Sequence, residues 1–260
     1  MRICTFNVNS VKARLDLVLN WLEQRKNDID ILCLQELKTV EAEFPFEEFE
    51  KRGFTSEVFG EKAYNGVAIC SKLPLSQVRK GFSDGEWDRQ KRLISASVGG
   101  LNLVNVYAPH GGLRGSEKFR FKREWFDKLT GTLASFYTPR DRLVLVGDFN
   151  VANEDLDVYS PQDLADAIGT MPEEREAFRK LLSWGLVDAF RHNHPQARLF
   201  TWWDYRTAGI WRDEGMRIDY ILCTRAVLPS IGDIGTDLWP RRRRTPIPSD
   251  HAPLIATLAA

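Results

Sequence analysis

The sequence has few of the features that mark membrane, secreted or zinc-binding proteins. Its four cysteines stand far apart in apolar segments, so they predict reduced core residues rather than disulfides. The four histidines form no zinc-ligand spacing with a cysteine. No apolar run approaches the length of a membrane span, and residues 1–7 lack the apolar stretch of a signal peptide. We therefore expect a cytoplasmic protein.

An excess of charge of either sign is also missing. Lys and Arg together number 36, as do Asp and Glu, and a net charge of zero neither predicts nor excludes a polyanionic partner. There is no repeat, linker or low-complexity segment. The 43% hydrophobic content is sufficient for a sizeable core. Candidate site residues near both ends of the sequence predict one domain over residues 1–260.

Positive charge is concentrated in three short runs. Residues 241–244 are all arginine, residues 89–92 carry three cations, and residues 118–123 carry four that alternate with aromatics. Such runs suit a nucleic-acid backbone, because phosphate neutralisation drives its binding. Solvated charge on a helix face is the alternative for residues 118–123.

Polar residues border apolar, strand-like runs at five places along the chain. Catalytic groups commonly sit at strand ends, although a turn or a helix cap is the alternative for each place taken alone. Asp148 and Asn150, for example, directly follow the apolar run 143–146. The full set is Asn7, Asn9, Glu36, Tyr107, Asp148, Asn150, Asp250 and His251.

Three carboxylates of this set predict a metal site. Glu36, Asp148 and Asp250 are oxygen ligands of the kind that Mg²⁺ prefers, so Mg²⁺ is expected and Mn²⁺ is possible in its place. A hard divalent cation neutralises phosphoryl charge, lowers the proton affinity of water and stabilises a departing alkoxide. The cluster therefore favours a metal-dependent phosphodiesterase.

The other polar residues suit the same chemistry. His251, with Asp219 in the strand-like segment 217–222, predicts an imidazole that is oriented by a carboxylate and can bind a phosphate oxygen or take part in proton transfer. The Tyr107 hydroxyl suits a hydrogen bond to a non-bridging oxygen. Asn7 and Asn150 can orient water, metal or phosphate without adding charge.

Seven short motifs stand in a fixed order along the chain. They are Asn7-Val8-Asn9, Leu34-Gln35-Glu36, Tyr64-Asn65-Gly66-Val67-Ala68, Tyr107-Ala108-Pro109, Gly147-Asp148-Phe149-Asn150, Arg217-Ile218-Asp219 and Ser249-Asp250-His251-Ala252-Pro253. Their order resembles that of the exonuclease III family of DNA-repair nucleases, within the wider endonuclease/exonuclease/phosphatase superfamily. The resemblance runs essentially end to end, and residues 200–206 resemble the bacterial exonuclease III branch rather than the lipid phosphatases.

The resemblance implies a fold and a set of residue roles. The fold is a four-layer α/β sandwich of the DNase I-like kind, with two packed mixed β-sheets flanked by helices and a site at one edge. Glu36 would ligate the metal with help from Asn7 and Asp250. Asp148 would align or deprotonate the attacking water, and Asn150 would orient that water. Tyr107 and His251 would contact the phosphate. Asp219 would hold His251.

The implied partner is double-stranded DNA, especially abasic sites and 3′ ends, bound by a monomer that is associated with the nucleoid. Trp202, Met216 and Ile218 match positions of an apolar pocket for a sugar without its base, and core packing is the alternative. His110 stands where many relatives have an amide, and we favour a loop role over a phosphate contact because two glycines follow it. The remaining candidates for DNA contact are Asn9, Arg92, Lys118 and Arg206.

The implied activity is cleavage 5′ to abasic sites, trimming of 3′ ends, or both, in base-excision repair. A phosphatase of phosphoinositides or other small phosphoesters is one alternative, against which the motif at 202–206 and the basic runs argue. A non-catalytic nucleic-acid-binding regulator is another. Such a regulator should have lost the ligands that this chain retains.

Periodicity predicts three helices. Residues 14–25 place apolar side chains on one face, and residues 117–137 form a second helix that Gly131 interrupts. Residues 170–173 resemble a capping box, with proline in the first turn of a helix that ends at Trp184. Residues 155–168 are a loop or a weak helix. Strands are predicted near the start and at Ile29, Gly66, Leu101, Leu143, Arg217 and Ala252, an alternation typical of layered α/β proteins.

Overall fold

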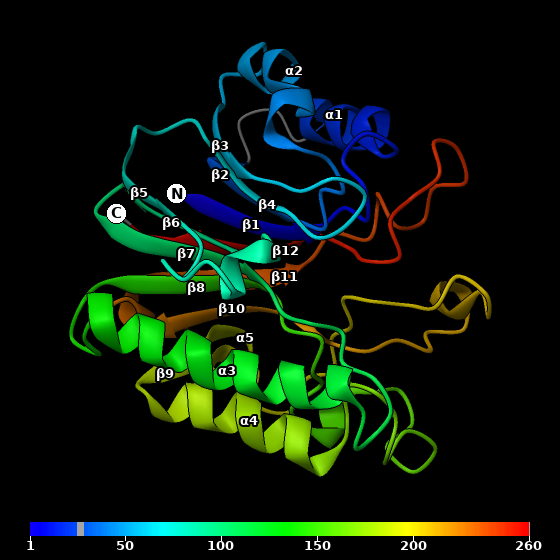
Figure 1. The fold of residues 1–260 in the computed structure, drawn as a ribbon. Coiled ribbons are helices and arrows are strands. Elements are labelled where there is room, and N and C mark those ends of the chain that lie inside the picture. The colour runs from blue at the N-terminus through cyan, green and yellow to red at the C-terminus, as the bar shows by residue number, and fades with distance from the viewer. Residues whose placement is uncertain (25–28, 260) are drawn as a thin grey trace.

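The elements of the chain form four layers, which confirms the predicted fold class (Figure 1). The computed structural model describes residues 1–24 and 29–259. Two six-stranded sheets pack face to face. Helices α1 (Leu15–Gln24) and α2 (Phe46–Glu50) cover the outer face of one sheet, and α3 (Glu117–Phe136) and α4 (Pro172–Ser183) cover the other.

Both sheets are mixed. The first has the strand order β11-β12-β1-β2-β4-β3, and the second β5-β6-β7-β8-β10-β9. The first sheet contains β1 (Arg2–Asn7), β2 (Ile31–Gln35), β3 (Thr55–Phe59), β4 (Val67–Ser71), β11 (Ile231–Thr236) and β12 (Leu254–Leu258). The second contains β5 (Leu75–Lys80), β6 (Leu93–Val98), β7 (Leu101–Tyr107), β8 (Leu143–Asp148), β9 (Leu186–Asp188) and β10 (Asp219–Thr224), and the short helix α5 (Ala189–Asn193) follows β9.

Apolar side chains fill the space between the sheets and the space between each sheet and its helices. The central strands read as nearly continuous apolar runs because both of their faces are buried. One polar contact joins the sheets inside this core. Gln35 Nε2 donates to Asn105 Oδ1 at 2.7 Å, and Asn105 Nδ2 donates back to the carbonyl oxygens of Leu34 and Ala68. This pair fixes how the end of β2 lies on β7.

Strand register brings the predicted site residues to one edge. In the first sheet β1 and β2 are parallel and end together, with Asn7 opposite Gln35. In the second, Tyr107 at the end of β7 lies opposite Asp148 at the end of β8. Asp148 in turn lies opposite Asp219, which begins the antiparallel β10. Strand pairing alone therefore gathers Tyr107, Asp148 and Asp219.

The predicted helices are confirmed, with one correction. Helix α1 lies within the predicted residues 14–25, of which residue 25 is outside the described part, and α3 begins and ends within one residue of its prediction. Helix α4 has Pro172 at its start and Trp184 as its C-cap. The predicted capping box is wrong by one residue, because Met171 is the N-cap and Glu174 accepts from its amide.

The sequence pattern misses five strands. β6 is a buried strand inside the second sheet, and the other four, β3, β5, β9 and β11, lie at sheet edges. β5 and β11 carry several exposed residues and a register shift each, so their apolar periodicity is weak. β3 and β9 lie at sheet edges, and β9 has only three residues. Residues 155–168 contain a 3₁₀ turn at Asp155–Asp157 and otherwise form a loop.

All four cysteines are free and buried, as predicted. Within residues 1–24 and 29–259, no helix combines the length and the apolar composition that a membrane crossing requires.

The contact between β7 and β8 gives a test of the fold. Gly147 has a φ of 145°, and a Cβ added there would lie 1.9 Å from the backbone oxygen of Val106. Because a strand backbone cannot move aside as a side chain can, Gly147→Ala should lower the free energy of unfolding by about 3 kcal/mol. Urea titration measures the loss.

Gly131→Ala is the matched control. Gly131 lies inside α3, where an added Cβ meets no atom within 4 Å. Alanine favours a helix interior over glycine by about 1 kcal/mol, so this variant should be more stable than the wild type by that amount. A Gly147→Ala protein as stable as the wild type would show that β7 and β8 can separate to admit a methyl group.

Candidate active site

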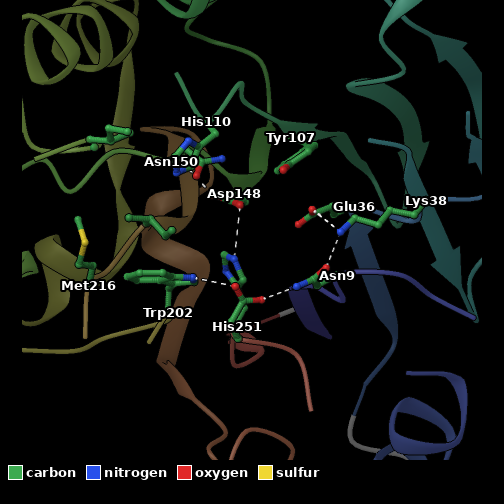
Figure 2. Close-up of a pocket in the computed structure, with 14 residues that line it drawn as sticks. Asn9, Glu36, Lys38, Tyr107, His110, Asp148, Asn150, Trp202, Met216 and His251 are labelled. Atoms are coloured by element: carbon green, nitrogen blue, oxygen red, sulfur yellow. Dashed lines mark hydrogen bonds and ion pairs between the residues drawn. The ribbon is translucent and has the colours of Figure 1, made fainter. Parts of the chain in front are cut away.

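A pocket of about 370 Å³ opens at the edge where the site strands end (Figure 2). Both sheets and the loops that follow their strands contribute to its walls. Its lining consists of Asn9, Glu36, Lys38, Tyr107, His110, Asp148, Asn150, Ile168, Gly169, Trp202, Met216, Ile218, Asp250 and His251. Eleven of these fourteen residues are among those that the sequence predicts for metal binding, catalysis or DNA contact, and Asn7, at the end of β1, lies just behind the pocket.

Asp148 is buried at the centre of the site, and its two oxygens have different partners. Oδ1 accepts from the backbone amide of Asn150 at 2.9 Å, and Oδ2 accepts from Asn7 Nδ2 at 2.8 Å. The second bond crosses from one sheet to the other. Asn150 is fixed as well, because its Nδ2 donates to the carbonyl oxygen of Ala108. The carboxylate is therefore held in one orientation from both sheets.

His251 links two carboxylates. Its Nδ1 lies 2.8 Å from Asp219 Oδ2, and its Nε2 lies 3.7 Å from Asp148 Oδ2. Burial lowers the pKa of this imidazole, but the charges of Asp219 and Asp148 outweigh burial and hold the pKa above its ordinary value. Burial raises the pKa of Asp148, although His251 opposes that rise. A carboxyl group and an imidazole thus titrate as a pair beside the pocket.

Tyr107 points into the pocket from the end of β7 (Figure 2). Burial, with the charges of Glu36 and Asp148, raises the pKa of its hydroxyl, so the phenol stays protonated as a hydrogen-bond donor. Arg92 lies behind its ring, with the guanidinium 4.8 Å from the ring centroid and NH1 donating to the Tyr107 carbonyl oxygen. Arg92 is 9% exposed and lies outside the pocket, so its contacts position Tyr107.

Lys38 was not predicted, and it bridges two predicted residues. Its Nζ lies 3.0 Å from Glu36 Oε1 and donates to Asn9 Oδ1 at 2.6 Å. Asn9, Glu36, Lys38 and Asn150 all have left-handed backbones, with φ between 47° and 57°. Residues other than glycine adopt this conformation at a cost of roughly 1–2 kcal/mol each. Backbone strain of this kind therefore occurs in the loops that carry the site, and it also occurs in other loops of the molecule.

Asp250 is anionic and held on both oxygens. Oδ1 accepts from Asn9 Nδ2 at 2.9 Å, and Oδ2 accepts from Trp202 Nε1 at 3.0 Å. Burial would raise the pKa of this carboxyl, but the charge of His251 and these two donors lower it. Arg241, from the basic run, is buried beneath it and donates to the carbonyl oxygens of Asp250 and Trp203. The prediction of four arginines available to a phosphate backbone is therefore wrong for Arg241.

The donor set fits a divalent cation. Glu36, Asp250 and Asn9 present carboxylate and amide oxygens to the same pocket. The Lys38 ammonium contacts two of these side chains at once, so their oxygens already converge on a position that a cation can occupy. Asp148, Asp219 and His251 form a second, buried group whose ligand atoms lie within 4.8 Å of one another.

One wall of the pocket is apolar. Trp202, Met216 and Ile218 pack there with Ala152 and Val158, and Ile168 borders the same space. Trp202 thus has two contacts of different kinds, because its ring belongs to this wall and its indole nitrogen donates to Asp250. Ile168 and Gly169 were not predicted, since they belong to a loop with no clear periodicity.

Several predicted residues lie outside the pocket lining. Asn7 and Asp219 are buried behind it and hold Asp148 and His251. Lys118 is exposed on the first turn of α3, and Arg206 is exposed and paired with Asp204.

His110, by contrast, is exposed and does line the pocket.

Comparison with known proteins agrees with this geometry. Residues 4–251 match the model of the Endonuclease/Exonuclease/phosphatase family. Exodeoxyribonuclease III of Haemophilus influenzae is 32% identical over 268 residues, which cover 98% of this chain and 99% of that protein.

Two solved structures are similar over 100% of this chain and 100% of their own chains. An AP endonuclease from Archaeoglobus fulgidus has a TM-score of 0.94 and 38% identity. A 3′ phosphatase from Neisseria, NExo, bound to a product DNA hairpin, has a TM-score of 0.93 and 39% identity. These relatives confirm the resemblance to the exonuclease III family. The chain belongs to the Endonuclease/Exonuclease/phosphatase family.

Proposed function

We propose that this protein is a divalent-metal-dependent DNA phosphodiesterase of base-excision repair, which cleaves 5′ to abasic sites, trims 3′ ends of duplex DNA, or does both. One observation carries the proposal. A buried Asp148, held by Asn7 and Asn150, faces His251 and Tyr107 across a pocket that also contains Glu36 and Asp250. Relatives that match along their full length include an exodeoxyribonuclease III, an AP endonuclease and a 3′ phosphatase bound to a DNA hairpin.

Each side chain then has a chemical task. Asp148 aligns or deprotonates the attacking water, and the raised pKa makes it a stronger base than an ordinary carboxylate. Asn150 orients that water. His251, held by Asp219, and the protonated Tyr107 donate to the phosphate oxygens, where charge increases in the transition state.

Glu36 and Asp250, with Asn9 beside them, are the proposed metal ligands. Mg²⁺, or Mn²⁺ in its place, bound there would neutralise phosphoryl charge and stabilise the departing alkoxide. The amide of Asn7 holds Asp148 and accepts from the backbone amide of Asn9, so Asn7 supports this site by orienting its neighbours. We place the metal on the Glu36 side because Asp219 is already committed to His251.

The apolar wall supports abasic DNA as a substrate. A deoxyribose without its base presents an apolar ring face that can pack against Trp202, Met216 and Ile218. Lys118 and Arg206 are exposed and can meet the flanking backbone, although Arg206 would first have to leave its ion pair with Asp204. His110 borders the pocket itself. The cytoplasmic and nucleoid location and the monomeric state belong to the same proposal.

Cleavage of a defined duplex tests the proposal. An end-labelled duplex with one internal abasic analogue should be cut by the pure protein in Mg²⁺ and left intact in EDTA. Asp148→Ala should lower kcat by about 10³-fold or more, because it removes the group that activates water. Its affinity for the duplex, measured by fluorescence anisotropy in EDTA, should stay within a few-fold of the wild type.

The products separate the possible activities. One product at the analogue identifies an abasic-site endonuclease, and a ladder from the 3′ end identifies an exonuclease. Asp233→Ala is the control, since this exposed carboxylate lies on β11 away from the pocket. Hydrolysis of soluble phosphoinositides with no cleavage of DNA would overturn the proposal, and full activity of Asp148→Ala would remove that residue from the mechanism.

The arginine run gives a second test. Arg242, Arg243 and Arg244 are exposed, although Arg243 also stacks on Trp239. Replacing these three with alanine should weaken duplex binding and reduce the salt slope of log K by about 2.7, because each lost phosphate contact contributes about 0.9.

The control removes the same charge elsewhere. Arg140, Arg142 and Arg225 are exposed at the ends of β8 and β10 that lie away from Asp148. Their triple alanine variant should keep the wild-type salt slope. Equal slopes for both triple variants would make residues 242–244 a solvated surface feature.

A further inference from the structure

Lys122 belongs to a basic run that the sequence associates with DNA, yet it does not reach the surface. Its side chain is 0% exposed and lies 2.7 Å from Glu174 Oε1, and the Glu174 side chain is also 0% exposed. Lys122 comes from α3 and Glu174 from the first turn of α4, so the ion pair joins these two helices, which lie side by side on the second sheet (Figure 1). A fully buried cation cannot neutralise a phosphate.

The Lys122 ammonium instead binds two loops of the site. It donates to the carbonyl oxygen of Asn150 at 2.7 Å and to that of His110 at 3.2 Å. Asn150 and His110 both line the pocket (Figure 2). Lys122 and Glu174 are not part of the lining, and both side chains are fully buried. All three donor positions of the ammonium are therefore used, one on a carboxylate and two on loop backbones.

Glu174 fixes a third loop with its other oxygen. Oε2 accepts from the backbone amide of Gly169 at 2.6 Å and from that of Met171 at 3.3 Å. Gly169 lines the pocket, and its carbonyl oxygen accepts from the amide of Ala152. One ion pair thus ties together three separate segments of the pocket wall.

These loops pack against the pair without spare room. A Cβ at Gly111 would lie 2.9 Å from Lys122 Cδ and 3.2 Å from Glu174 Oε1. A Cβ at Gly169 would lie 3.0 Å from the Asn150 oxygen that Lys122 binds. The glycines allow the backbone to approach, and the ion pair then holds it there.

The neighbouring carbonyl groups show why this contact matters for Asn150. The carbonyl oxygens of the next three residues, 151–153, accept hydrogen bonds from Tyr220, Arg175 and Arg179 respectively. Lys122 completes the series at Asn150, whose φ of 52° is strained and whose amide also orients Asp148. A strained backbone persists only where its surroundings hold it.

Stability alone does not account for the pair. A buried ion pair loses its hydration, and apolar residues of similar volume are often as stabilising. Apolar residues would nevertheless offer no donor to Asn150 and His110 and no acceptor to Gly169. The ion pair therefore differs from an apolar pair in that it holds the three loops in place.

We propose that Lys122 and Glu174 are positioning residues for phosphodiester cleavage, which hold Asn150, His110 and Gly169 at the geometry that the reaction requires. This inference rests on the proposed function of the same pocket. It excludes Lys122 from direct contact with DNA and gives α4 a role in catalysis through the loops that it holds.

Three variants separate positioning from stability. Lys122→Met leaves Glu174 buried without its cation, and should lower Tm by about 10 °C. The double variant Lys122→Met/Glu174→Gln removes both charges but keeps an oxygen for the Gly169 amide, so its Tm should return close to the wild-type value. Lys180→Met is the control, because Lys180 joins the same two helices through Asp127 at the surface.

Kinetics on the abasic duplex then give the decisive comparison. At a temperature where all proteins are folded, Lys122→Met and the double variant should both lose about 100-fold in kcat, since a displacement of about 1 Å at a site can cost that much. KM should change less than threefold, and Lys180→Met should match the wild type. Recovery of kcat together with Tm in the double variant would overturn the proposal.

Hydrogen exchange provides a readout that does not depend on activity. In the double variant, peptides that cover residues 149–153 and 168–171 should exchange about 10-fold faster, while α3 and α4 keep their wild-type rates. Unchanged exchange in these loops would overturn the positioning role. A wild-type protein that fails to cleave DNA would instead overturn the proposed function, and the exchange data would still decide whether the pair holds the loops.

Discussion

The site depends on one hydrogen bond between the two sheets, from Asn7 Nδ2 to Asp148 Oδ2. Asn7 ends β1 and Asp148 ends β8, so this bond sets how one sheet lies on the other at the edge where the pocket opens. Ser249 extends the link, because its hydroxyl donates to the Asn7 carbonyl oxygen and accepts from the His251 amide. If one sheet shifted relative to the other, the Asp148 carboxylate would move away from the His251 imidazole, with which it titrates as a pair.

Around this bond the protein uses burial for two different purposes. In the pocket, burial shifts the protonation of Asp148 and Tyr107 toward states suited to proton transfer and phosphate contact. Behind the pocket, the buried charges of Lys122 and Glu174 bind each other and the backbone of three loops. The first group lines the pocket, where a substrate can meet it, and the second lies outside the lining and holds backbone.

The sequence predicted the fold class, the main helices and the strand-end residues because these signals are local: an apolar run, followed by a polar residue, marks a strand and its end. Residues such as Asn7, Asp148 and His251 are recognised in this way. The environment of a cation is not local. In the sequence, Lys122 and Arg241 look no different from the exposed cations beside them in the same basic runs. They are buried only because segments that are distant in the sequence pack over them. Lys38 and Ile168 join the pocket through loop conformations that no periodicity indicates, and the role of each pocket residue in catalysis stays a prediction.

The position of β12 has a consequence for the timing of synthesis. This strand inserts between β11 and β1, so residues 2–5 pair with residues 254–257 in the interior of a sheet. Pairing β1 with β12 closes a loop that contains most of the chain. Closing this loop costs conformational entropy, and the contacts that offset the cost form only when β12 docks. Asp250 and His251 immediately precede that strand. A ribosome-bound chain that has reached Arg241 therefore contains Glu36, Asp148 and Asp219 but lacks two residues of the pocket, which is assembled only after β12 has docked.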